Sequence, residues 1–119
     1  MSVTEQIRAA FETKDLTLLA PLLAEDVRWG DGDQPRACRN RQQVLDTFGG
    51  LLGSGVEGEI TELAQGDHGI LCALTVHWPE GMDRPRHGQL WQVYLLRAGL
   101  IAEIRRFDDR PNAAEAAGL

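Results

Sequence analysis

The sequence predicts an α+β fold in which a helical N-terminal half precedes a meander of long strands. Amphipathic segments of helical periodicity dominate the first half, whereas residues 57–107 are rich in β-branched, aromatic and aliphatic residues. No repeat, low-complexity block or linker interrupts the 119 residues, which suffice for one core. We therefore expect one domain over residues 1–111. Residues 112–119 form an alanine-rich tail that either makes one helical turn or stays loose.

The N-terminal segment predicts two helices. Ser2 and Glu5 form a capping pair, and apolar residues recur at helical spacing over the next two turns. Asp15 caps a second, short helix. Pro21 kinks that helix or begins its final turn. The buried face of the second helix consists of Leu16, Leu19, Leu22 and Leu23.

A short strand, a polar loop and a third helix follow. The strand covers residues 27–29 and ends in a Gly-Asp-Gly-Asp turn. Asn40 and Gln43 form a second capping pair, which opens a helix that ends in the glycine-rich residues 49–55. Residues 57–64 and 70–78 are expected to form strands, and a longer polar loop over residues 79–86 leads to the last two strands.

Residues 89–97 and 100–107 predict the hairpin around which the chain is organised. Gly99 can take the positive φ that the two-residue turn Ala98-Gly99 needs. If Arg97 faces Leu100, a period of two gives one face with Trp91, Val93, Leu95, Ala102, Ile104 and Arg106. The other face then carries Leu90, Gln92, Tyr94, Leu96 and Ile101. That second face is too apolar for solvent, and we expect it to form a homodimer interface.

Composition limits the partners and cofactors. The formal net charge of −6 argues against nucleic acid or an anionic membrane as main partner, and no run approaches transmembrane length. Cys38 and Cys72 follow no ligand spacing and favour free thiols in a reducing cytoplasm. His68, His77 and His87 have no acid or cysteine at ligand spacing, so we expect no metal site. No phosphate-binding loop is present, and no cofactor is expected.

The order of elements, with residues 15–29 and 98–103, resembles the nuclear-transport-factor-2-like superfamily. That superfamily includes SnoaL-like cyclases, ketosteroid isomerases and limonene epoxide hydrolase. The resemblance covers nearly the whole chain and implies a cystatin-like cone, in which a curved antiparallel or mixed sheet wraps around the N-terminal helices. It also implies a pocket at the open end of the cone. The matching motifs are loose and concern the fold more than the activity.

The catalytic positions of these relatives carry over only in part. The isomerase aspartate that follows the first strand corresponds to Asp31, but the isomerase tyrosine on the first helix corresponds to Ile7. The acidic residue on the last strand of the cyclases and the hydrolase corresponds to Arg106. The arginine and aspartate on the middle strand of the hydrolase correspond to Leu74 and Val76. Each known chemistry therefore lacks at least one part in this chain.

Asp31 and Arg106 are the candidate polar residues of the site. At the mouth of an apolar pocket, desolvation would raise the pKa of Asp31 towards that of a useful general base. The alternative is that Asp31 serves its glycine-rich turn. Arg106 would be buried and would need a partner, which is Asp31, a ligand carboxylate or phosphate, or the face of Trp91.

An apolar lining completes the predicted site and suits a flat hydrophobic ligand. The same side chains could instead fill the cone as core. We expect a small-molecule pocket protein that isomerises or cyclises a hydrophobic substrate by acid–base chemistry. The alternative is a non-catalytic ligand-binding or dimerising module, favoured by the missing oxyanion donor. The predicted ligand-binding residues are Phe11, Trp29, Leu74, Val76, Trp91, Ile104 and Arg106.

Overall fold

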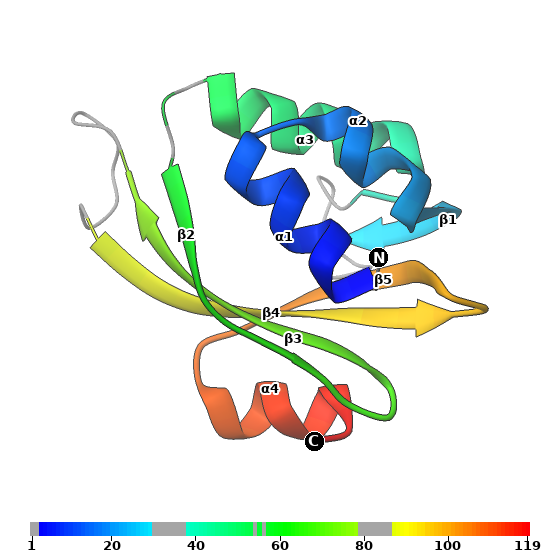
Figure 1. The fold of residues 1–119 in the computed structure, drawn as a ribbon, viewed down its shortest axis with the longest axis vertical. Helices are drawn as coiled ribbons and strands as arrows, with labels where there is room; N and C mark the ends of the chain where they lie inside the picture. Colours follow the sequence, from blue (N-terminus) through cyan, green and yellow to red (C-terminus); the bar gives the residue numbers. More distant parts are fainter. Residues whose placement is uncertain (1–2, 30–37, 54, 56, 79–86) are drawn as a thin grey trace.

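A five-stranded mixed sheet curves beneath the N-terminal helices in the computed structural model, and a fourth helix covers its other side (Figure 1). The structure describes residues 3–29, 38–53, 55, 57–78 and 87–119. The strand order is β1-β5-β4-β3-β2. The architecture confirms the predicted α+β class. None of the described helices is long and apolar enough to cross a membrane.

The second N-terminal helix begins where the sequence predicts but is shorter than predicted, because Leu23, expected on its buried face, begins strand β1. Helix α1 covers Val3–Thr13, α2 covers Leu16–Leu19, and a 3₁₀ turn covers Ala20–Leu22. The Asp15 carboxylate accepts a hydrogen bond from the Thr17 backbone N–H at 2.9 Å, which confirms the predicted cap. Pro21 lies in the 3₁₀ turn, where its fixed φ is compatible with a helical start.

Strand β1 covers Leu23–Trp29 and is longer than the predicted strand. Helix α3, Arg41–Gly53, begins at the predicted capping pair. The Asn40 side chain accepts from the Gln43 backbone N–H at 2.9 Å, and the Gln43 side chain accepts from the Arg39 backbone N–H at 2.8 Å. The first of these bonds satisfies an N–H group that the first helical turn leaves without a partner, and the second fixes the chain that leads into the helix.

The remaining strands form an antiparallel meander. They are β2 (Glu57–Gln65), β3 (Gly69–His77), β4 (His87–Arg97) and β5 (Leu100–Phe107). Strand β1 lies parallel beside β5, so that segments far apart in the sequence share one edge of the sheet. The β4–β5 turn matches the prediction: Arg97 opposes Leu100, and both Ala98 (φ 52°) and Gly99 (φ 82°) have positive φ.

A β-bulge changes the register beyond this turn. Ala102 is an extra residue on β5, so that Leu96 opposes Ile101 but Leu95 opposes Glu103. Because of this shift of one residue, every later residue of β5 pairs with a different residue of β4, and the side chains that share a face change accordingly. The predicted register is therefore wrong from Ala102 onwards.

The bulge separates two residues that the sequence placed together. Trp91 opposes Phe107, whereas Gln92 opposes Arg106. Trp91 and Arg106 thus project from opposite faces of the sheet, and the predicted stacking of Arg106 on Trp91 is wrong.

The concave face of the sheet and the N-terminal helices enclose the larger core, here called the inner cluster. Tyr94, Ile101 and Ile104 are almost completely buried in it, and Leu90 and Leu96 pack against it. Leu90, Tyr94 and Leu96 were predicted to lie on the outer face of β4, where they motivated the expected dimer interface. In the structure they face the interior instead. The buried members of the inner cluster also include Ile7, Leu19, Leu23, Val27, Val44, Phe48, Ile70, Cys72, Leu74 and Val76.

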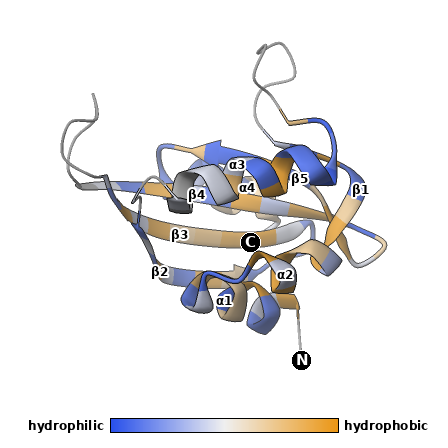
Figure 2. Cartoon of the chain, turned by 90° about the horizontal axis from the view of Figure 1, so that it is seen from above, coloured by the Kyte–Doolittle hydropathy of each residue, from blue (hydrophilic) through white to orange (hydrophobic). Residues whose placement is uncertain are grey.

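The C-terminal residues are not a loose tail but helix α4, Arg110–Ala117, packed on the convex face. Asp109 caps its N-terminus, and Gly118, with φ 79°, ends it. Figure 2 shows the hydrophobic strand β3 running between α1 on one side and α4 on the other, as Figure 1 also shows. The core beneath α4, here called the outer cluster, consists of Leu71, Val93, Ala113 and Ala117 with Trp91, Leu95, Phe107, Ala114 and Ala116.

Candidate functional site

An aromatic group lies where β1, α1 and α3 meet inside the cone. Phe48 stacks on Trp29 with ring centroids 4.5 Å apart and an interplanar angle of 20°. Phe11 meets Phe48 edge-on, with centroids 5.8 Å apart and an angle of 78°. Both arrangements are favoured for aromatic pairs, and together they give an apolar wall of three rings. Phe48 was not among the predicted site residues, because helical periodicity does not reveal which apolar residue of a helix meets the other elements of the site.

The structure brings together five of the six apolar residues that were predicted to line a pocket. They belong to the inner cluster or pack against it: Phe11, Trp29, Leu74, Val76 and Ile104. Trp91 is the exception, because it packs under α4 in the outer cluster. Ile104 is almost completely buried, and Phe11 and Trp29 are only partly buried. The partly buried aromatic rings are therefore the members that a ligand could reach.

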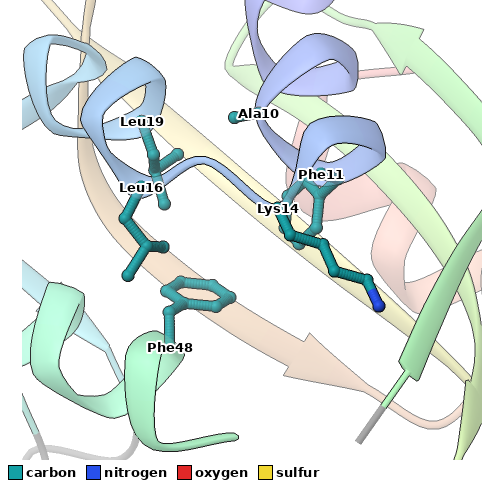
Figure 3. Close-up of a pocket in the computed structure, with 6 residues that line it drawn as sticks. All are labelled: Ala10, Phe11, Lys14, Leu16, Leu19 and Phe48. Carbon is teal, nitrogen blue, oxygen red and sulfur yellow. The ribbon is translucent and has the colours of Figure 1, made fainter. Parts of the chain in front are cut away.

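Two cavities border Phe11. The smaller, of about 30 Å³, lies between α1, α2 and α3, as Figure 3 shows, and has room for about one water molecule. The larger, of about 310 Å³, lies between the end of α1 and the start of β2. That volume is at the lower end of the range for small-molecule sites. The smaller cavity is lined by Ala10, Phe11, Lys14, Leu16, Leu19 and Phe48, and the larger by Phe11, Glu12, Gly58, Glu59 and Ile60.

Charged side chains surround these cavities at the molecular surface. Arg8 and Glu12 approach to 3.8 Å, and Lys14 and Glu57 approach to 3.9 Å. All four side chains are about half exposed or more, and such pairs contribute little to stability. The larger cavity is therefore bordered by charged as well as apolar residues, since Glu12 and Glu59 belong to its lining.

Of the two predicted polar residues of the site, Asp31 and Arg106, the structure describes only Arg106. Asp31 lies outside the described residues. Arg106 projects from the concave side of β5, like Ile104 two residues earlier, but its side chain is 56% exposed. Its Nη2 is 3.8 Å from Oδ1 of Asp108, a side chain that is itself 91% exposed. The prediction of a buried arginine is therefore wrong, because Arg106 lies near the end of the strand.

A buried polar chain crosses the concave face, and sequence reasoning missed it. The Tyr94 hydroxyl donates a hydrogen bond to Oε1 of Gln92 at 2.6 Å. Burial raises the pKa of the neighbouring Cys72 to about 12. Burial is also the main reason that the pKa of Tyr94 lies well above its ordinary value, so both groups stay neutral at physiological pH. The bulge at Ala102 was the missing information, since without it Gln92 and Tyr94 seemed to face outwards.

The position of the isomerase tyrosine on α1 holds an apolar residue in this chain. Ile7, at the corresponding position, is completely buried and apolar. Cys38 and Cys72 are both free thiols. Within the described ranges, histidine, cysteine, aspartate and glutamate side chains form no group of three that could hold a metal ion.

Comparison with known proteins reveals similarity at the level of structure. No family model and no curated protein sequence matches the chain. A proposed polyketide cyclase from Sinorhizobium meliloti is 15% identical, with TM-score 0.66 over 87% of this chain and 94% of that chain. An NTF2-like protein of unknown function from Burkholderia pseudomallei is 18% identical, with TM-score 0.69 over 100% of both chains. A proposed ketosteroid isomerase from Kribbella flavida is 16% identical, with TM-score 0.70 over 90% of this chain and 77% of that chain.

Identities this low establish a shared backbone arrangement and leave activity open. They agree with the curved mixed sheet, the helices on its concave face and the predicted cone. The chain therefore has the nuclear-transport-factor-2-like, cystatin-like fold.

Proposed function

We propose that this protein binds a hydrophobic small molecule in its cone and isomerises or cyclises it by acid–base chemistry. The observation that carries the proposal is the aromatic group of Phe11, Phe48 and Trp29, of which Phe11 also lines a cavity of about 310 Å³. Pockets for small molecules are lined predominantly by hydrophobic and aromatic side chains. The structural neighbours described as a cyclase and an isomerase support the same class of reaction.

In this proposal Asp31 is the general base and Arg106 is its electrostatic partner. Trp29 is the last described residue of β1 and pairs with Ile104, two residues before Arg106. A carboxylate near the apolar wall would lose solvation, which raises its pKa and improves it as a base. The guanidinium of Arg106 at hydrogen-bonding distance would instead lower the pKa of Asp31.

Titration of Asp31 by NMR tests this assignment. We expect a pKa above the ordinary aspartate range, and we expect Asp31→Asn to remove turnover of any substrate found, while Asp33→Asn retains it. A pKa below the ordinary range would assign Asp31 to an ion pair with Arg106 and remove it as the base.

The alternative is a non-catalytic ligand-binding protein. The specific observation that favours it is the buried, apolar Ile7, which cannot donate a hydrogen bond to an oxyanion from the position of the isomerase tyrosine. Thermal-shift measurements against steroids, polyketides and terpenoids test both functions. Stabilisation without turnover would support the binding protein, and stabilisation by none of these compounds would contradict both.

Two further parts of the proposal concern assembly and location. A homodimer through the convex sheet face would have to form beside or beneath α4, since α4 covers part of β3, β4 and β5. Sedimentation that gives only a 13.1 kDa species at micromolar concentration would exclude the dimer. The two free, buried cysteines favour a reducing compartment such as the cytoplasm.

A further inference from the structure

The larger cavity has an apolar inner wall and a charged rim. It lies between the last turn of α1 and the first half of β2, which Figure 1 shows beside each other. Phe11 and Ile60 are partly buried and pack against the inner cluster, whereas Glu12 and Glu59 are exposed. The cavity therefore leads from the molecular surface to the inner cluster.

Gly58 is the residue of this lining that has no side chain. It pairs with Val76, and Ile60 pairs with Leu74; both partners on β3 belong to the inner cluster. Because side chains alternate between the two faces of a strand, a side chain at position 58 would point to the concave side, as that of Ile60 does. A Cβ atom placed there would have no heavy atom of the described residues within 4 Å, so position 58 opens onto the empty space of the cavity.

Neither the backbone nor the packing of β2 requires a glycine at position 58. Gly58 does not have a positive φ, and the β-bulge of β2 lies further along the strand, between Ile60 and Glu62. Glycine weakens the interior of a strand, and apart from bulges and bends it marks places where a ligand or another backbone approaches closely. Since no described backbone occupies the space beside position 58, the glycine favours the approach of a ligand.

The volume of the cavity limits the size of such a ligand. An apolar cavity of about 150 Å³ binds one benzene ring. By the same measure, the cavity of about 310 Å³ has room for two fused rings. The smaller cavity, which also borders Phe11, adds room for about one water molecule. Four fused rings would therefore fit only if the surrounding elements moved.

We propose that this cavity binds a hydrophobic group of two fused rings, and that Gly58 determines this size. The inference rests on the proposed function and narrows its substrate class. The rings lie against Phe11 and Ile60, and one edge crosses the backbone of Gly58. Burial of the rings and their contact with an aromatic side chain stabilise the complex, and a polar group of the ligand stays at the rim.

Three alcohols of increasing size test the proposal: benzyl alcohol with a single ring, 2-naphthalenemethanol with a fused pair, and 1-pyrenemethanol with a larger fused system. Equilibrium dialysis measures the binding of each. We expect 2-naphthalenemethanol to bind at least about tenfold more tightly than either of the others. In NMR spectra of the nitrogen-labelled protein, its binding should shift the backbone amide signals of Gly58 and Ile60 more than those of α4.

Variants at position 58 test the role of the glycine. A phenyl group takes the room of one ring, so Gly58→Phe should weaken 2-naphthalenemethanol binding at least about tenfold and make benzyl alcohol the tighter ligand. Gly58→Val should have an intermediate effect. Phenylalanine and valine are both favoured in strands, so the fold should be retained, which far-UV circular dichroism checks. Gln65→Phe, which introduces the same residue at the exposed far end of β2, should leave all three affinities unchanged.

The outcomes separate this inference from the proposed function. If 2-naphthalenemethanol binds equally well to the unaltered protein, Gly58→Val and Gly58→Phe, the ligand lies elsewhere in the cone; the inference is then overturned and the proposed function stands. Binding of 1-pyrenemethanol as tight as that of 2-naphthalenemethanol would overturn the size limit. If none of the three alcohols binds, the inference is overturned, and the thermal-shift measurements with steroids, polyketides and terpenoids decide the proposed function independently.

Discussion

Tyr94 shows how one side chain connects packing with chemistry in this protein. Its ring is buried in the inner cluster, and its hydroxyl donates a hydrogen bond to Gln92. In such surroundings a hydrogen bond is strong, and a group left without its partner is costly. Tyr94 therefore contributes to the stability of the core and also determines which way the Gln92 amide points.

Tyr94→Phe should lower the free energy of unfolding by about 1–3 kcal/mol, because Gln92 Oε1 loses its donor in a buried place. Urea unfolding measures this. Replacing both partners, as Tyr94→Phe with Gln92→Leu, should recover part of the loss, since no unsatisfied acceptor then remains. A double variant whose loss equals the sum of the two single losses would show that the hydrogen bond contributes nothing.

Burial of Cys72 should make the protein less stable at alkaline pH. Its pKa is about 12 in the folded protein, against 9.0 for an ordinary thiol, so between these values the unfolded chain loses a proton that the folded chain keeps. Stability conferred by the neutral thiol is complete below about pH 9 and declines as the pH rises, by about 1.4 kcal/mol per pH unit for one proton. The raised pKa of Tyr94 acts in the same direction.

Urea unfolding between pH 8 and pH 11 tests this. Cys72→Ala should give a shallower decline, although its stability at pH 7 is lower because of the lost packing. Cys38→Ala serves as the comparison for removal of a buried thiol. Equal slopes for Cys72→Ala and the unaltered protein would contradict the explanation.

At the scale of elements, α4 is held at both ends. The Asp109 carboxylate accepts from the backbone N–H and the side chain of Asn112, each at 2.9 Å. At the other end, the Ala117 carbonyl accepts from the His68 backbone N–H at 2.9 Å, so the β2–β3 turn caps the helix. Between these ends, Ala113 and Ala117 are completely buried against the sheet. Small side chains let the helix approach closely, and its attachment depends on the caps more than on bulky apolar residues.

Asp109→Ala should therefore lower the free energy of unfolding by about 0.5–2 kcal/mol, the usual cost of losing an N-cap. Asp109→Ser should restore most of it. Asp108→Ala is the control, because the neighbouring carboxylate is 91% exposed and caps no helix. The unfolding free energy is measured in urea, and equal values for the alanine variants at positions 108 and 109 would contradict the capping role.

At the scale of the molecule, β3 and β4 contribute to both clusters. Tyr94 and Cys72 face the inner cluster, and Val93 and Leu71 face the outer one, from adjacent positions on the same strands. Neither cluster can lose its packing without exposing strands that the other uses. We therefore expect the two layers to unfold as one cooperative unit.

Tryptophan fluorescence measures this cooperativity layer by layer. Trp91→Phe leaves Trp29 and Trp78 as probes of the inner cluster, and the double variant Trp29→Phe/Trp78→Phe leaves Trp91 under α4. Within each variant, the fluorescence midpoint in urea should coincide with the far-UV circular dichroism midpoint. A Trp91 signal that changes at lower urea concentration than the circular dichroism would show that α4 detaches first.

Sequence signals located the elements but not all of their contacts. Asp15 and the Asn40–Gln43 pair identified two helix starts, because capping depends on a few neighbouring residues. The bulge at Ala102 and the docking of α4 depend on contacts between distant segments, and an alanine-rich octapeptide carries little periodicity of its own. The aromatic wall could be predicted only in part. Phe11 and Trp29 were predicted because they are apolar residues at the ends of short elements. Phe48 was not, because its contribution depends on how α3 packs against the rest of the fold.

The pleat of strand β4 alternates its side chains between the two faces of the sheet. From residue 90 to residue 96, the even-numbered positions face the proposed ligand chamber and the odd-numbered positions face the C-terminal helix. A saturation scan of these seven positions should therefore yield two interleaved patterns. Changes at even positions alter what the protein binds, and changes at odd positions alter whether the C-terminal helix stays attached.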